Sequence, residues 1–81
     1  MVVKIYKGSN NRSKIDIICL MIIMLLENHI INYVDFEKFN ISKLTFYRYI
    51  SYIRFILADF GFYHLELVYF YNVGYKLVKY S

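Results

Sequence analysis

The chain has 81 residues, a formal net charge of +4, and a composition that is 59% apolar and 21% aromatic. This length predicts a single domain, which buries only about 60% of the surface that its unfolded chain exposes. The apolar side chains are more numerous than one small core can hide, which favours burial against a second copy or a partner. The single cysteine, Cys19, excludes an internal disulfide. Its place in an apolar run predicts a buried thiol in a reducing cytoplasm.

The first predicted helix follows a β-prone arm at residues 1–12 and begins at Ser13, a good N-cap residue. Its apolar run, residues 17–26, would extend only about 15 Å as a helix, whereas a bilayer core is about 30 Å thick. No cleavage-like site follows the run, so we expect neither a membrane span nor a signal peptide. Because the run is apolar on every side, residues 13–28 are predicted to form the central helix or a dimer seam.

A short second helix is expected to begin at Asn32 or Asp35 and to end at Phe39, after an extended link at residues 30–31. Asn40 then supplies a turn, since asparagine tolerates a left-handed backbone. The third helix should begin at the N-cap residue Ser42 and continue to residue 60. Its apolar residues recur at steps of three and four, which predicts one buried stripe comprising Phe46, Ile50, Ile53, Leu57 and Phe60.

The net charge of the chain maps to this third helix and its approach. Charges cancel over residues 1–37 and again over residues 59–81, whereas residues 38–58 contain no acid and four cations, Lys38, Lys43, Arg48 and Arg54. A basic helix face of this kind suits a surface that meets phosphates. On charge alone, a solvated helix face with chance basic residues explains the pattern equally well.

Two partly alternating segments, residues 64–71 and 74–80, are separated by a break at Asn72 and predict a β-hairpin. Gly74 is expected to meet a backbone requirement at the turn. The simplest arrangement directs four side chains inward over the third helix: Leu65, Leu67, Tyr75 and Leu77.

The sequence offers little for catalysis or metal binding. His29 and His64 are 35 positions apart and have no acidic or cysteine partner at ligand spacing. We find no glycine-rich phosphate loop, nucleophile motif or pair of carboxylates at catalytic spacing. We therefore expect no enzyme activity, no cofactor and no metal site.

Two motifs resemble a known family. Residues 40–50, Asn-Ile-Ser-Lys-Leu-Thr-Phe-Tyr-Arg-Tyr-Ile, resemble the hydrophobic-Ser-x-x-Thr-hydrophobic-x-Arg-x-Ile signature of DeoR-like winged-helix regulators. Residues 73–77, Val-Gly-Tyr-Lys-Leu, are similar to the wing strand of those proteins and of response-regulator output domains. The resemblance covers roughly residues 13–78. It implies a mainly α fold with a small β-hairpin, a winged helix-turn-helix with three helices in residues 13–60 and a wing in residues 61–81.

Three positions differ from the usual motif. Such proteins have a small residue where this chain has Phe36 and a leucine where it has Asp35, which predicts a shifted or splayed second helix. Tyr49 stands where the signature commonly has aspartate, so the third helix is more apolar than a typical DNA-reading helix.

The resemblance implies a small cytoplasmic transcriptional regulator that binds double-stranded DNA as a homodimer, with the third helix in the major groove and the wing along the backbone. A protein-interaction or dimerisation module, or the N-terminal domain of a larger regulator, is the alternative. An interfacial membrane peptide is disfavoured, because the basic residues and the apolar run do not share one helix. The residues expected near bases and phosphates are Lys43, Thr45, Tyr47 and Arg48, followed along the backbone by Ser51, Tyr52 and Arg54, with Lys76 from the wing.

Overall fold

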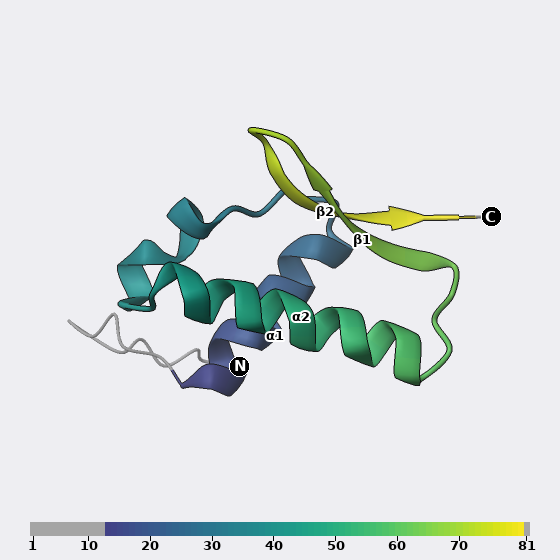
Figure 1. Cartoon of the computed structure of the whole chain (residues 1–81), viewed down its shortest axis with the longest axis horizontal. Coiled ribbons are helices and arrows are strands. Elements are labelled where there is room, and N and C mark those ends of the chain that lie inside the picture. The colour runs from purple at the N-terminus through teal and green to yellow at the C-terminus, as the bar shows by residue number, and fades with distance from the viewer. Residues whose placement is uncertain (1–12, 81) are drawn as a thin grey trace, which may run out of the picture.

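The computed structural model describes residues 13–80; the predicted arm at residues 1–12 lies outside the described residues. The described part is mainly helical with a small antiparallel hairpin, as predicted, and its arrangement is compatible with a winged helix (Figure 1). The elements in chain order are α1 (Lys14–Leu26), the 3-10 helix η1 (Tyr33–Phe39), α2 (Lys43–Asp59), β1 (Leu65–Phe70) and β2 (Gly74–Lys79).

Side-chain caps fix where both α-helices begin. The Ser13 hydroxyl accepts a hydrogen bond from the Asp16 amide at 3.2 Å, and the Ser42 hydroxyl accepts one from the Thr45 amide at 3.0 Å. Each bond satisfies an amide that has no partner within its own helix. Asn40, between η1 and α2, adopts the left-handed conformation with φ 60°. The two predicted caps and the predicted turn are confirmed.

The second helix begins after Asn32 and is a tight 3-10 helix rather than an α-helix. The Asn32 amide donates to the Asp35 carboxylate at 2.9 Å, which stabilises its first turn. Phe36, at the position where related motifs carry a small residue, is fully buried and packs between Phe39 and Phe46. This short helix therefore contributes a large aromatic side chain to the core.

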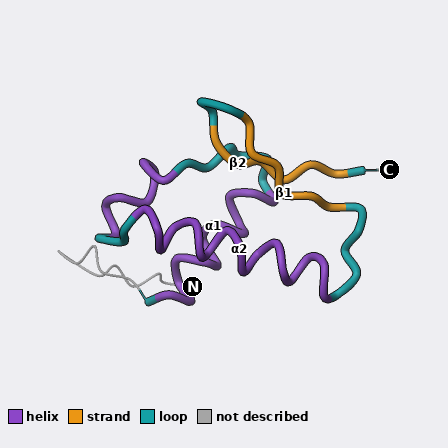
Figure 2. The backbone as a smooth tube through the Cα atoms, viewed as in Figure 1, coloured by secondary structure: helices purple, strands orange, loops and turns teal. Residues whose placement is uncertain are grey.

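The hairpin gains a third partner from the link before η1. β1 and β2 pair in antiparallel register, and Ile31 exchanges two backbone hydrogen bonds with Tyr75 on the other edge of β2. Gly74 has φ 136°, and a Cβ at this position would lie 2.5 Å from the Ile31 carbonyl oxygen. The predicted backbone requirement for Gly74 is thus confirmed, and its cause is this close approach. Figure 2 shows the hairpin along one side of the two α-helices.

The core draws side chains from every element. The predicted stripe of α2 is confirmed at Phe46, Ile50 and Ile53, while Leu57 is half-buried. The prediction for Phe60 is wrong, because α2 ends at Asp59 and the Phe60 side chain is 74% exposed. Contributions from outside α2 come from Ile17, Met21, Leu25, Ile31, Phe36, Leu67 and Leu77.

Helix α1 is buried on one face only. Its buried residues are Ile17, Met21 and Leu25, which pack toward α2 and β2. The prediction that Cys19 is buried is wrong: this residue is exposed, because no described element covers the opposite face of α1. No described helix is both long enough and apolar enough to cross a bilayer.

Candidate nucleic-acid interface

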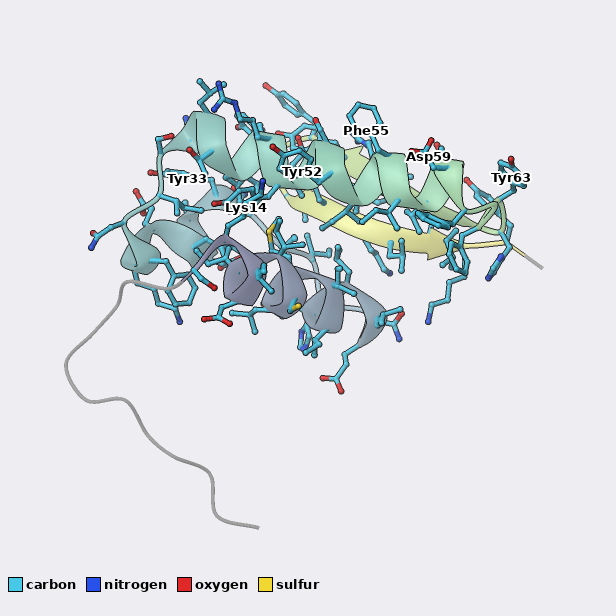
Figure 3. All side chains as sticks on the ribbon, turned by 90° about the horizontal axis from the view of Figure 1, so that it is seen from below. Lys14, Tyr33, Tyr52, Phe55, Asp59 and Tyr63 are labelled. Carbon is cyan, nitrogen blue, oxygen red and sulfur yellow. The ribbon has the colours of Figure 1, made fainter. Side chains whose placement is uncertain are left out.

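The outward face of α2 is set by helical periodicity. With Phe46, Ile50 and Ile53 in the core, a period of 3.6 residues turns Leu44, Arg48, Ser51 and Phe55 away from it. Figure 3 shows Phe55 pointing away from α1. We call Leu44, Arg48, Ser51 and Phe55 the outer face of α2.

Arg48 lies in the middle of the outer face and is exposed. It forms no hydrogen bond, ion pair or ring contact with any residue between 13 and 80. The other three cations of residues 38–58 each lie over an aromatic ring: Lys38 over Phe39, Lys43 over Tyr33, and Arg54 over Tyr75. Among residues 13–80, the other three cations thus have a ring contact, whereas all the N–H donors of Arg48 are available to a ligand.

Arg54, predicted to contact the DNA backbone, joins α2 to the hairpin. Its Nε and Nη2 atoms donate to the Leu67 carbonyl oxygen of β1 at 3.3 and 3.0 Å. Its guanidinium carbon lies 5.5 Å from the centre of the Tyr75 ring. Two of its five N–H donors are therefore engaged in holding the hairpin, and the remaining edge stays at the surface.

Tyr47 lies in an aromatic cluster between α2 and the hairpin. Its ring centre is 6.5 Å from that of Tyr75, which in turn lies 5.0 Å from Tyr69. Burial raises the pKa of Tyr75 above its ordinary value, the Arg54 charge opposes this effect, and the neighbouring tyrosines add to it. Tyr47 remains partly exposed, so one edge of its ring borders the outer face.

Two predicted site residues serve the helix and its packing. Thr45 is half-buried, and its hydroxyl accepts a hydrogen bond from Ser42 at 2.9 Å as part of the N-cap. Tyr52 stacks on Tyr49 and lies under the ammonium group of Lys14, which is 4.2 Å from the ring centre (Figure 3). The polar partner of Tyr52 thus comes from the first turn of α1.

Lys76 does not join the other predicted site residues. Tyr75 and Leu77 face α2, and successive residues of a strand point to opposite faces, so Lys76 lies on the far face of the hairpin. The turn between the strands contains Tyr71, Asn72 and Val73, and it presents no charge. The predicted wing cation is therefore separated from Arg48 by the thickness of the hairpin.

Five of the eight predicted residues lie on one side of α2: Lys43, Tyr47, Arg48, Ser51 and Arg54. Sequence reasoning missed Leu44 and Phe55, which flank Arg48 and are each 61% exposed. Their positions in the helical period, opposite Ile53 and Phe46, were the available signal. The predicted buried stripe of α2 did not include Tyr49, which is buried in the core.

We compared the chain with known protein families, proteins and structures. No protein family, curated protein or solved structure matches the chain. Within residues 13–80, no three His, Cys, Asp or Glu side chains gather closely enough to hold a metal ion.

Proposed function

We propose that this domain is a transcriptional regulator of the cytoplasm that binds double-stranded DNA, with α2 as the helix that enters the major groove. The observation that carries the proposal is the guanidinium of Arg48, which has no partner among residues 13–80 and lies in the middle of an exposed helix face. Such a guanidinium can bond a guanine edge or a phosphate through two parallel N–H groups.

The neighbours of Arg48 suit distinct parts of a duplex. Lys43, in the first turn of α2, is a flexible point charge suited to a phosphate. Leu44 can contact a thymine methyl group, and the hydroxyls of Tyr47 and Ser51 can bond phosphate oxygens. Recognition helices contact base edges mainly through their N-terminal residues, which places Leu44, Tyr47 and Arg48 nearest the bases.

The number of exposed cations near the outer face that are not bonded to the hairpin sets the expected salt dependence. Lys38, Lys43 and Arg48 are exposed and belong to the segment that holds the net charge. If each neutralises one phosphate, the logarithm of the association constant should fall with the logarithm of salt concentration with a slope of about −3 per protomer.

The test is anisotropy titration of a labelled duplex at several salt concentrations, with Arg48→Ala compared with Lys79→Ala. Both variants lose one exposed cation, but Lys79 lies at the end of β2, outside residues 38–58. Arg48→Ala should weaken binding by about 1–3 kcal/mol, or about 5- to 150-fold, if Arg48 reads a base. Lys79→Ala should change the affinity less than twofold. Absence of binding at low salt, or equal losses in both variants, would overturn the proposal.

A protein-interaction module is the second candidate, and the exposure of Leu44 and Phe55 favours it. Large apolar side chains around an arginine are typical of protein-binding surfaces. In that case Leu44→Ala and Phe55→Ala would abolish capture of a protein partner, and Arg48→Ala would leave duplex binding unchanged. If instead the domain reads DNA, Phe55→Ala should change duplex affinity little, because Phe55 lies two turns beyond Arg48.

A further inference from the structure

The face of α1 that no part of residues 13–80 covers is a continuous apolar ridge. Ile15 is 71% exposed and Ile23 55%, and with Cys19 and Leu26 they follow one another at steps of three and four residues. This spacing places all four on one side of the helix. The only charged residues of α1 are Lys14 and Asp16, both in its first turn. We call Ile15, Cys19, Ile23 and Leu26 the α1 ridge.

An apolar groove lies beside this ridge. It has a volume of about 230 Å³ and lies between the C-terminal halves of α1 and α2. Leu65 of β1 and Leu77 of β2 line it from the hairpin. All of its lining residues are apolar, among them Ile22, Leu26, Ile56 and Phe62. Leu26 belongs to both the groove and the ridge, so the two features form one surface.

We propose that a second copy of the chain covers this surface, with α1 packed antiparallel against α1 of the other copy around a two-fold axis. In a two-fold dimer both copies contribute the same patch, so the patch must be complementary to itself. A patch that contains a ridge beside a groove meets this condition, because the ridge of one copy can fill the groove of the other. If Ile15 lies opposite Leu26 of the second copy, then Cys19 lies opposite Ile22 of the second copy. Both pairs are centred on the same point of α1, as an antiparallel helix pair requires. Each ridge then lies against the opposite groove.

The area available matches what a stable dimer needs. Five exposed side chains on this surface are Ile15, Ile23, Leu26, Ile56 and Phe62. Their exposed fractions correspond to roughly 500 Å² of apolar surface, and stable complexes bury about 800 Å² per partner, of which about 60%, or roughly 480 Å², is apolar. A small ligand in the groove would leave Ile15 and Ile23 in water, so a second copy covers the surface more completely.

The proposed dimer leaves the outer face of α2 free. Figure 3 shows α1 on the side of α2 opposite to the direction in which Phe55 points. The inference does not require DNA binding, and dimerisation can be measured without DNA. Failure of one proposal is thus distinguishable from failure of the other.

The test is sedimentation analysis from about 1 to about 100 µM protein, with Ile23→Glu compared with Leu44→Glu. Both variants place an acid at an exposed apolar helix position, but Leu44 lies on the outer face of α2. The wild type and Leu44→Glu should sediment as dimers in high salt as well as low, because the interface is apolar. Ile23→Glu should be monomeric with an unchanged far-ultraviolet circular dichroism spectrum. Ile15→Glu, at the other end of the ridge, repeats the test if Ile23→Glu fails to fold.

Cys19 supplies an independent test of the register. The pairing places the two Cys19 residues about 5 Å apart along the helix axis, so a short bismaleimide should link them. This link should form in the wild type and disappear in Ile23→Glu. A monomeric wild type at 100 µM, a dimer that dissociates only in Leu44→Glu, or a dimer without the Cys19 link would each overturn the proposal.

Discussion

Phe46 is the centre of the aromatic core, and its removal should cost a large part of the stability of the domain. Its side chain is fully buried, and its ring lies 5.6 Å from Phe36 and 6.1 Å from both Tyr33 and Tyr75. Phe46→Ala removes this apolar surface and leaves a cavity that the hairpin and η1 cannot both close. A buried Phe→Ala change costs about 3–5 kcal/mol, whereas a domain of this length is typically stable by only about 4–12 kcal/mol.

Phe55→Ala is the matched control, since it makes the same chemical change on the same helix at an exposed position. Urea unfolding followed by circular dichroism should give a loss below about 1 kcal/mol for this variant, because surface substitutions seldom exceed that value. The midpoint of Phe46→Ala should fall far below that of Phe55→Ala, with similar slopes for both. Equal losses would refute the packing of α2 described above, because they would show that Phe46 is no more buried than Phe55.

Other predictions concern the hairpin and the helix cap. Gly74→Ala should destabilise the domain by at least about 1–3 kcal/mol, because a non-glycine residue is strained at φ 136° and the added Cβ would clash with the Ile31 carbonyl oxygen. Hydrogen exchange should show loss of protection at the Ile31 amide. Because burial raises the pKa of Tyr75, the folded chain holds this proton more tightly than the unfolded chain, and stability should decline as the pH rises from 10 through the folded-state pKa. Tyr75→Phe should make that decline shallower in urea unfolding between about pH 9 and about pH 11.5. Ser42→Ala should cost about 1 kcal/mol in thermal unfolding through loss of the Thr45 amide bond, and Ser42→Asn should restore most of it.

Local interactions made the helix starts and the turn predictable. The bonds of Ser13 and Ser42 join residues three positions apart, and the conformation of Asn40 depends on that residue itself. The ends and the uncovered faces of helices depend on distant residues. Phe60 continues the apolar period of α2 but lies beyond its last turn, and Cys19 lies on a helix of which only one face meets another element.

In the candidate site, too, some features follow from the local sequence and others depend on distant residues. The outward direction of Arg48 follows from the period of the buried stripe, so the sequence was sufficient to predict it. The bond from Arg54 to the Leu67 carbonyl depends on where β1 passes over α2, which no local pattern records. The face occupied by Lys76 depends on which side of the hairpin meets α2, and the alternation that placed Tyr75 and Leu77 inward already implied the answer.

The hairpin is fixed to the helical part of the domain at two points, the middle of β1 and the turn. Arg54 holds β1 to α2, and the Asn32 side chain donates to the Val73 carbonyl at the turn at 3.3 Å. If the domain binds DNA as proposed, a hairpin held in this way needs little ordering on binding, which reduces the entropic cost of association. The proposed interface uses only three cations of the described residues, Lys38, Lys43 and Arg48, so under the proposal a single protomer should bind duplex DNA only weakly, as non-specific contacts of this kind do.

Two linked protomers would overcome this weakness, because the second binding event becomes intramolecular. If both proposals hold, Ile23→Glu should weaken duplex binding by at least about tenfold and halve the salt slope, although Ile23 lies on α1, away from Arg48. Leu44→Glu should also weaken binding, through charge repulsion at the outer face, but without changing the oligomeric state. Anisotropy and sedimentation on the same samples separate the two effects. Unchanged duplex affinity in a monomeric Ile23→Glu would show that DNA binding and dimerisation are independent properties of this fold.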